Sequence, residues 1–592
     1  MHSTANSPSQ NRRVAIAQSA KHQWTLRGSA NSQENLSSHV DFFETRANHI
    51  YGANSAIAAD TKLLSLLPSP KGMKDLSLAV DRILLAIQNC EQITIFGDYD
   101  VDGTTSCAML KLFFDALNVP VDIYIPDRLI EGYGLNATGL KKIAASGGGL
   151  VITVDNGIAA VEACRVASEL GLTVIITDHH DLPPELPQAF AILNPKQIDC
   201  PYPYRMLAGV GVAFCLMTAL RAALIAAGNS KASNVSLRSF LDFVALGTIA
   251  DMAPLDGVNH ILCRVGLEVM AENIHQRIRP GIAQLLTLAG WDGASPLDAS
   301  DIGFKIGPRL NAAGRLGTAL AATDILSTVD PLQAAELAAF LHAENTSRQQ
   351  IEKQMTTQAF DKISNMKSLP AAFVLHHDTW HSGVVGLVAS RVLERFYRPT
   401  LALCTLNGKI KGSGRSTHAF DLFSVLNKVR HKFIAFGGHF HACGLTIEPE
   451  NLPWLIEYLN EQAEMLLTPA DILHPLHIDG LAQLNTFTAP FLEKLSMFEP
   501  YGIENPRPRW LVKNIEIAEI KSIGKSVEAN HAKVKLSDSF GSENWFTAFG
   551  LAEDLRIVMG SKIDFVIEGR ISFWKGNRRP ELRIVDFLPH SV

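Results

Sequence analysis

Several features are scarce in this 592-residue chain, and their scarcity excludes several classes of protein. The eight cysteines are scattered and form no CxxC pair, which argues against a structural zinc site and favours reduced thiols in the cytoplasm. Segment 1–40 is rich in Ser, Asn and Gln and lacks the apolar run of a secretory signal. The net charge of −6 is modest, so any nucleic-acid binding has to come from local basic patches.

A membrane-spanning run is also lacking. One stretch, Leu207 to Leu220, is nearly all apolar, but Arg221 ends it after 14 residues. A helix needs about 20 apolar residues to cross a bilayer. We therefore expect a buried helix here and no membrane segment.

What the chain does contain is typical of a soluble, globular protein, with 47% hydrophobic and 19% charged residues. Its length favours about three to five domains. From about residue 75, helical patterns alternate with the short apolar runs "QITIF", "VDIYI", "GLVITV" and "LTVIIT". Continuous apolar strands alternating with helices predict a parallel α/β sheet covered by helices on both faces.

The remaining sequence predicts a connector helix, a second α/β unit and a β-barrel. Residues 331–363 are amphipathic and have no internal Pro or Gly, which indicates one long helix. The last 110 or so residues carry about five short β-runs, which favours a small barrel of the OB type. The predicted parts are a flexible polar segment (1–40), a catalytic α/β domain (41–325), the connector helix (326–367), a smaller α/β domain (368–467) and a nucleic-acid-binding OB fold (468–592).

An unusual group of acidic residues follows the first apolar strand. "TIFGDYDVDGTTS" places Asp98, Asp100 and Asp102 within five residues. Two carboxylates ~6 Å apart at an effective dielectric of ~20 repel by roughly 3 kcal/mol. A bound cation would compensate for this repulsion.

The ends of two further strands carry similar side chains. Asp155 follows "VITV", and Asp178, His179 and His180 follow "VIIT"; Asp251 ends an expected helix. Because the carboxyl ends of parallel strands meet at one edge of a sheet, we expect these groups to converge. Carboxylates with imidazole suit Mn²⁺ or a similar divalent ion, and shared carboxylates suit two ions.

Two simpler interpretations compete with a metal centre. A lone Asp after a strand often caps the next helix. Three strand ends that all carry Asp or His are harder to explain in this way. Asp98, Asp100, Asp102 and Gly103 also match the first half of an EF-hand loop, but the twelfth position is Met109 instead of Glu, and no helix precedes the loop. The EF-hand interpretation therefore fails.

Two other stretches suggest contact with nucleic acid. "GSGRS" places Ser413 and Arg415 in what we expect to be a flexible Gly-rich loop that cradles phosphate, although most such loops are only loops. "FWKGNRRPELR" mixes aromatic and basic residues, including Trp574, Arg578 and Arg579. This mixture suits single-strand binding, and a solvated hairpin tip is almost as good an interpretation.

Several sequence motifs, taken together, resemble those of a known family. "DYDVDGTTS", "VITVDNG", "TDHH" and "GTIADMAPL" resemble the four motifs of the DHH phosphoesterases, and "GKIKGSGRS" and "GGHFHACGLTI" resemble their associated DHHA1 domain. "PDRLIEGYG", "GPRLNAAGRL" and "HSGVVGLVASR", together with the barrel, are similar to the branch that degrades single-stranded DNA from its 5′ end. The resemblance spans about residues 75 to 590.

The resemblance implies a role for each acidic or histidine residue of the motifs. The implied metal ligands are Asp100, Asp102, Asp155, His179 and Asp251. Asp155 would also be catalytic as the bridge between two ions, Asp98 would orient a ligand or the attacking water, and Asp178 would support the histidines. His180 is implied either as a ligand or as a phosphate contact, and both roles stay open.

The resemblance also implies how the strand is held. Ser413, Arg415 and Arg128 would hold the terminal 5′ phosphate, and Tyr133 would stack near the first base. The implied contacts to the DNA backbone and to the scissile phosphate are Arg309, Arg315 and His439.

One position departs from the family pattern. Many DHH phosphoesterases have a His four residues before the first ligand Asp, and here that position is Phe96. One metal site would then lose a nitrogen donor, which puts tight binding of both ions without substrate in question.

The resemblance implies a Mn²⁺- or Mg²⁺-dependent 5′→3′ exonuclease that degrades single-stranded DNA to 5′ mononucleotides in recombination and repair. It also implies a monomer that acts with a single-strand-binding protein and a helicase. One alternative is a DHH phosphodiesterase of short oligoribonucleotides or dinucleotides, but such enzymes are shorter and lack the barrel. The other is a non-enzymatic strand-binding protein on a decayed fold, but decay would erase the motif residues, which are present apart from the Phe96 position.

Overall fold

The computed structural model describes residues 15–18, 22–27, 39–52, 63–127, 131–293, 295–316, 319–524, 530–574 and 577–590. Arg128 lies outside these residues, and so do the side chains of Arg315 and Trp574.

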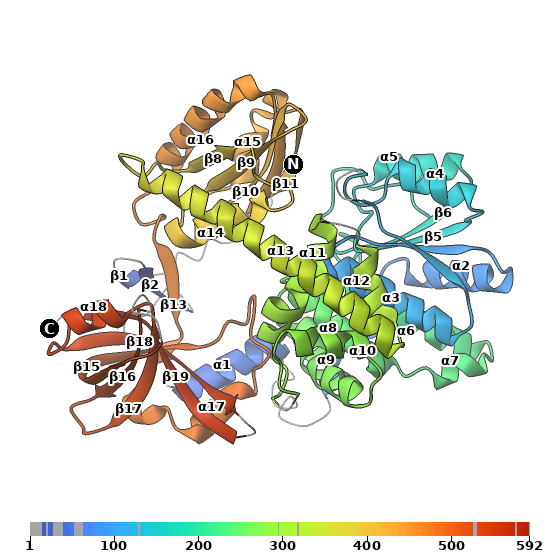
Figure 1. The fold of residues 1–592 in the computed structure, drawn as a ribbon. Helices are drawn as coiled ribbons and strands as arrows, with labels where there is room; N and C mark the ends of the chain where they lie inside the picture. Colours follow the sequence, from blue (N-terminus) through green and yellow to red (C-terminus); the bar gives the residue numbers. More distant parts are fainter. Residues whose placement is uncertain are drawn as a thin grey trace, which may run out of the picture.

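The first domain is built on a five-stranded parallel sheet in the order β4-β3-β5-β6-β7. The strands are β3 (Ile93–Phe96), β4 (Val121–Tyr124), β5 (Leu150–Val154), β6 (Thr173–Thr177) and β7 (Ala191–Leu193). The helices beside the sheet are α2 (Leu76–Gln88), α3 (Val101–Ala116), α4 (Ala137–Ala145) and α5 (Val161–Glu169). Because α2 and α3 pack into one apolar cluster and α4 and α5 into another, both faces are covered, as predicted (Figure 1).

A helical part completes this domain below the sheet in Figure 1. Its helices are α6 (Gly209–Ala226), α7 (Ser230–Asn234), α8 (Leu241–Ala250), α9 (Gly257–His275), α10 (Pro280–Leu288), a π-helix (Asp301–Ile306), α11 (Gly307–Leu316) and α12 (Leu320–Ser327). Of the helices in the described ranges, α6 is long and apolar enough to cross a membrane. It packs against α3 and α8 and buries Val212, Leu216 and Leu220 in the core, which is the environment of an ordinary buried helix.

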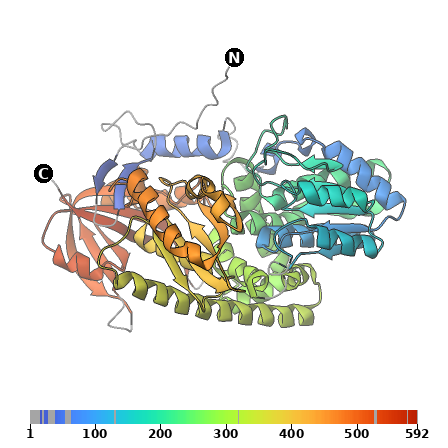
Figure 2. The same ribbon diagram turned by 90° about the horizontal axis from the view of Figure 1, so that it is seen from above.

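The predicted connector helix is confirmed as α13 (Pro331–Ser364). Its first half buries Ala338 and Leu341 against the helices of the first domain. Its second half buries Met355 and Ala359 in the second domain. At 34 residues, α13 is about 50 Å long, and it runs along both domains in Figures 1 and 2.

The second domain contains a five-stranded mixed sheet in the order β11-β12-β10-β9-β8. The strands are β8 (Phe373–His377), β9 (Thr400–Leu406), β10 (Lys409–Arg415), β11 (Ala435–His439) and β12 (Ala442–Ile447). The helices are α14 (Val385–Phe396), α15 (Leu422–Asn427) and α16 (Leu452–Leu466).

The prediction of a flexible loop at "GSGRS" is wrong, because the first four of these residues form the end of strand β10. β10 lies between β9 and β12. A Cβ atom at Gly412 would lie 2.2 Å from the carbonyl oxygen of Ala402, and one at Gly414 would lie 2.6 Å from side-chain carbons of Leu401 and Leu422. The glycines therefore allow close packing and do not make the segment flexible.

The C-terminal domain is the predicted barrel. Its strands are β14 (Gly480–Leu481), β15 (Arg509–Ser522), β16 (His531–Ser537), β17 (Glu543–Phe549), β18 (Ile563–Trp574) and β19 (Asn577–Pro589), with helices α17 (Ala489–Ser496) and α18 (Ala552–Ile557). The sheet runs β14-β15-β16-β17-β19-β18, and a further pairing of β15 with β18 closes the barrel.

The expectation of a flexible segment at 1–40 is wrong for the residues that the structure describes there. β1 (Ala15–Gln18) and β2 (His22–Leu26) form a three-stranded sheet with β13 (His474–Ile478). Trp24 is buried, and its Nε1 donates to Asp586 at 2.7 Å. The residues around Trp24 are mostly polar, so the sequence did not indicate a strand here.

Helix α1 (His39–Tyr51) begins at the edge of the segment that we assigned to the catalytic domain. It buries Phe42, Phe43 and Ile50 in the core of the barrel, beside which it lies in Figures 1 and 2. Strand β2 and helix α1 therefore pack against the C-terminal domain. The domain boundaries remain a prediction.

Candidate metal centre and strand-binding surface

The first acidic residues lie where β3 ends and α3 begins. Asp100 caps α3, because its Oδ1 accepts hydrogen bonds from the backbone N–H groups of Asp102 (3.0 Å) and Gly103 (3.1 Å). Asp98 is buried, and its Oδ1 accepts from the N–H of Tyr99 at 2.8 Å. The cap occupies one oxygen of Asp100, so a capping role and a ligand role are compatible in the same side chain.

Asp102 points toward the N-terminus of α6. Its Oδ2 accepts from the N–H of Gly209 at 2.6 Å, and its Oδ1 accepts from Val210 at 2.9 Å. A Cβ at Gly209 would lie 2.7 Å from Oδ1 of Asp155, so only glycine lets the helix come this close. The positive end of α6 therefore faces two buried carboxylates.

Asp155 lies at the centre of the acidic residues. It follows β5 with a φ of 61°, a conformation that Asp and Asn tolerate better than most residues. Its Oδ1 is 3.1 Å from Nε2 of His179, and both atoms are buried without a hydrogen-bond partner. Two buried ligand atoms that face one another without hydrogen bonds fit a site for a cation.

Among the residues that the structure describes, three groups of side chains have ligand atoms within 4.8 Å of one another. The groups are Asp98 with Asp100 and Asp155, Asp155 with His179 and His180, and Asp102 with His179 and Asp251. Asp155 and His179 each belong to two groups, so the structure brings together the residues that the sequence placed at separate strand ends. Asp98, which we expected only to orient a ligand or the attacking water, lies among the potential ligands.

The electrostatics of this cluster also fit a cation. Burial and the neighbouring carboxylates raise the pKa of Asp155 well above its usual range, that of Asp102 to about 7 and that of Asp251 to about 9. Burial also lowers the pKa of His179 to about 3, which keeps its imidazole neutral and suited to ligation. A divalent ion would offset the cost of ionising these carboxylates.

Asp178 holds the two histidines in place. Its Oδ1 accepts from the N–H groups of His179 (2.7 Å) and His180 (3.0 Å) and is 2.7 Å from Nδ1 of His180. Its Oδ2 accepts from Ile158 N at 2.8 Å. Burial alone would lower the pKa of His180, but the hydrogen bond to Asp178 raises it to about 9.

We expect Asp178→Asn to weaken Mn²⁺ affinity by about 10- to 100-fold, because the amide cannot accept all of these hydrogen bonds and the histidines lose their orientation. Titration calorimetry with Mn²⁺ measures this loss. Asp122→Asn, at an exposed position on β4 of the same sheet, is the matched control. Unchanged affinity in Asp178→Asn would contradict the supporting role.

Phe96 provides no ligand atom, and its surroundings explain why an aromatic residue fits there. The side chain is fully buried in the apolar cluster with α4 and α5. Its ring stacks on Tyr124 with a centroid distance of 5.1 Å. Phe96 thus contributes core packing and no ligand atom to the acidic cluster.

Tyr133 lies at the rim of the cluster, and His439 lies on the second domain. The hydroxyl of Tyr133 is 3.3 Å from Nε2 of His180, and its side chain is 54% exposed and accessible to a base. His439 is exposed on β11 of the second domain. It is among the charges that lower the pKa of Asp181, after Lys196, so it lies within electrostatic reach of the residue that follows His180.

The outer face of β10 presents the expected phosphate-binding residues. Lys411, Ser413 and Arg415 alternate with buried glycines and so share one face of the strand. Lys411 and Ser413 line a cavity of about 370 Å³ together with Ser382. Lys411 was not predicted, although the alternation in "KIKGSGR" was a usable signal for a strand.

The other expected strand contacts lie in different environments. Arg309 is nearly buried, and its Nε donates to Nδ1 of His342 on α13 at 3.3 Å. For this nitrogen to bind DNA, Arg309 would have to give up its hydrogen bond to the connector helix. Arg578 and Arg579 are exposed on β19. The guanidinium of Arg578 lies 5.5 Å from the ring of Phe573.

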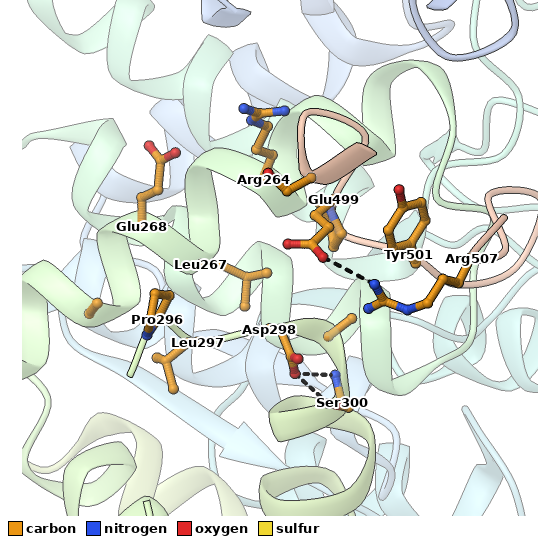
Figure 3. A pocket seen from close by; sticks show the side chains of 14 residues that line it. Arg264, Leu267, Glu268, Pro296, Leu297, Asp298, Ser300, Glu499, Tyr501 and Arg507 are labelled. Carbon is orange, nitrogen blue, oxygen red and sulfur yellow. Dashed lines mark hydrogen bonds and ion pairs between the residues drawn. The ribbon is translucent and has the colours of Figure 1, made fainter. Parts of the chain in front are cut away.

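A further cavity of about 470 Å³ lies between α9 and the segment around Glu499 and Tyr501 (Figure 3). Arg507 and Glu499 pair across it at 3.4 Å, and Leu267 lies on its apolar side. None of the predicted site residues lines this cavity, so it is separate from the acidic cluster.

Comparison with known proteins identifies all three domains. The models of the DHH family N-terminal domain, the DHHA1 domain and the RecJ OB domain match residues 92–248, 350–465 and 478–586. The chain is 39% identical over 519 residues to the single-stranded-DNA-specific exonuclease RecJ of Bacillus subtilis, a match that covers 87% of this chain and 63% of that protein. It is 35% identical over 560 residues to the protein of the same name from Haemophilus influenzae, covering 92% and 95% of the two chains.

A solved structure gives the same result. The crystal structure of RecJ in complex with Mn²⁺ from Thermus thermophilus matches with a TM-score of 0.76 and 25% identity over 97% of this chain and 80% of that one. The matches extend from the sheet that carries the acidic cluster through the connector helix to the barrel. This chain therefore belongs to the RecJ family.

Proposed function

We propose that this protein is a metal-dependent exonuclease that degrades single-stranded DNA from its 5′ end to 5′ mononucleotides. The observation that carries the proposal is the buried cluster in which Asp155 Oδ1 and His179 Nε2 face each other 3.1 Å apart without hydrogen-bond partners. Such a cluster, in a chain that also carries a cationic strand face on β10, suits cleavage of a phosphodiester.

The cluster would hold two divalent ions, Mn²⁺ or Mg²⁺. The residues that would hold them are Asp98, Asp100, Asp102, Asp155, His179 and Asp251, with His180 at the edge. When bound, such ions lower the pKa of a nucleophilic water and neutralise charge on the phosphate that is attacked. Asp155 belongs to two of the three groups, which supports its role as a bridge.

The side chains of the chain itself position the substrate. Ser413 and Arg415 on β10 would bind the terminal 5′ phosphate, which sets the direction of digestion. His439 would hold the scissile phosphate from the second domain, and Tyr133 would stack on the first base. Asp178 fixes the orientation of His180, whose Nε2 points toward the rim next to Tyr133.

The cellular setting is part of the proposal. We place the enzyme in the cytoplasm, as a monomer that meets its substrate together with a single-strand-binding protein and a helicase during recombination and repair. Support comes from the cysteines, all eight of which are free thiols, and from the acidic cluster and the proposed phosphate-binding strand β10 belonging to one chain.

A panel of 3′-labelled substrates tests the proposed function. With Mn²⁺, a 5′-phosphorylated single strand should shorten from its 5′ end, while a blunt duplex should remain intact. EDTA should stop the reaction. Cleavage only of an RNA strand or a dinucleotide would overturn the proposal in favour of a small-substrate phosphodiesterase. Binding of the strand without any cleavage would overturn it in favour of a non-enzymatic strand-binding protein.

A further inference from the structure

A lysine at the edge of the acidic cluster has no role in the function proposed so far. Lys196 follows β7 in the segment "LNPKQ", and its side chain is 23% exposed. Its Nζ is 2.8 Å from Oδ1 of Asp181, the residue directly after His180. The segment that carries the second histidine therefore also carries the partner of this lysine.

Two buried polar residues fix the position of Lys196 relative to the histidines. The Nδ2 of Asn194 donates to the carbonyl oxygen of His180 at 2.9 Å, and its Oδ1 accepts from the N–H of Lys196 at 2.8 Å. Gln197 is buried as well, and its Nε2 donates to the carbonyl of Ile192 at 2.7 Å. A turn built with buried amides holds its residues more firmly than an ordinary surface loop.

The ammonium group of Lys196 also acts on the cluster itself. Its positive charge lowers the pKa of Asp251, which burial and the neighbouring carboxylates raise. The same charge also lowers the pKa of His179, which burial already lowers. Lys196 and His439 both act on Asp181. Lys196 thus lies within electrostatic reach of the candidate ligands, and its partner Asp181 lies within electrostatic reach of His439 on the second domain.

The pair that Lys196 makes with Asp181 is easily opened. The carboxylate of Asp181 is 71% exposed, and pairs of this kind contribute little to stability. A polyanion that approaches a cluster of carboxylates is repelled unless cations at the rim offset the repulsion. The ammonium of Lys196, whose carboxylate partner can be displaced, is suited to offset this repulsion.

We propose that Lys196 is a phosphate-binding residue, and that a phosphate of the single strand next to the metal centre replaces Asp181 as its partner. Asp181 then acts as a stand-in for the phosphate in the free enzyme. The proposal rests on the proposed function, because it deepens the description of the same site.

A double-mutant cycle tests the exchange of partners. The affinity of a fluorescent 5′-phosphorylated oligonucleotide is measured by anisotropy in EDTA, where the strand is not cut. Lys196→Ala should weaken binding about tenfold, the low end of what one charge-assisted contact contributes. Asp181→Asn should tighten binding about twofold, and this gain should vanish in the double variant, because it acts through Lys196.

A second pair on the same domain provides matched controls. Lys74 pairs with Asp199 at 2.8 Å with exposures of 32% and 68%, close to those of Lys196 and Asp181. Lys74→Ala and Asp199→Asn should each leave the affinity unchanged. The log–log salt dependence of binding should flatten by about 0.7 in Lys196→Ala and in neither control.

The outcomes separate this inference from the function on which it rests. If Lys196→Ala and Asp181→Asn both weaken binding, or if neither changes it, the pair is an ordinary salt bridge and the inference is overturned. A gain from Asp181→Asn that persists in the Lys196→Ala background overturns it as well. A wild-type protein that neither binds nor cuts the strand would instead overturn the proposed function.

Discussion

Asp155→Asn is expected to lower kcat on single-stranded DNA by about a thousandfold or more, the largest effect of any substitution considered. Asp155 belongs to two of the three potential ligand groups, and an amide would not replace the carboxylate that we propose as a bridge. Asparagine keeps the size of the side chain and tolerates the φ of 61° at this position. The fold should therefore survive, so that single-turnover rates with Mn²⁺ report on the site.

Asp115→Asn provides the control for this experiment. Asp115 lies at the end of α3, where it pairs with Lys111 on the exposed side of the helix, and its loss should leave the rate within about twofold of wild type. Near-wild-type activity in Asp155→Asn would show that the chemistry takes place elsewhere.

The second large effect is expected at Arg415, the side chain on β10 that we assign to the 5′ phosphate. Arg415→Ala should reduce the preference for a 5′-phosphorylated over a 5′-hydroxyl strand by about 10- to 100-fold, because charge-assisted hydrogen bonds contribute about 1.5–3 kcal/mol. The ratio of kcat/KM for the two strands measures the preference. Digestion of the 5′-hydroxyl strand should change little, since that substrate lacks the phosphate.

Lys409→Ala tests whether any cation on β10 would have the same influence. Lys409 begins the strand and pairs with Glu448, so its loss should leave the preference unchanged. An equal loss of preference in both variants would indicate a general electrostatic effect. An unchanged preference in Arg415→Ala would remove Arg415 from the phosphate site.

The sheet edge that carries the acidic cluster could be predicted because its signals are local. Each apolar run is short and continuous, and each ends in Asp or His, so the carboxyl ends of β3, β5 and β6 could be placed together from topology alone. The long helix α13 was equally clear, since no Pro or Gly interrupts its pattern.

Other parts could not be predicted because their cause lies in distant residues. Gly412 and Gly414 indicated flexibility locally, whereas the structure uses them to pack β10 against β9. The strand around Trp24 exists because β13, some 450 residues later, offers it an edge. The role of Lys196 could not be predicted, because its ion pair with Asp181 forms only when β7 lies beside β6.

The most direct test of the metal centre is an anomalous difference map of crystals grown with Mn²⁺, recorded at the manganese absorption edge. We expect two peaks about 3.5–4 Å apart, with Asp155 between them and His179 bound to one. Peaks elsewhere in the molecule, with none beside Asp155, would contradict the assignment of the buried cluster as the metal centre.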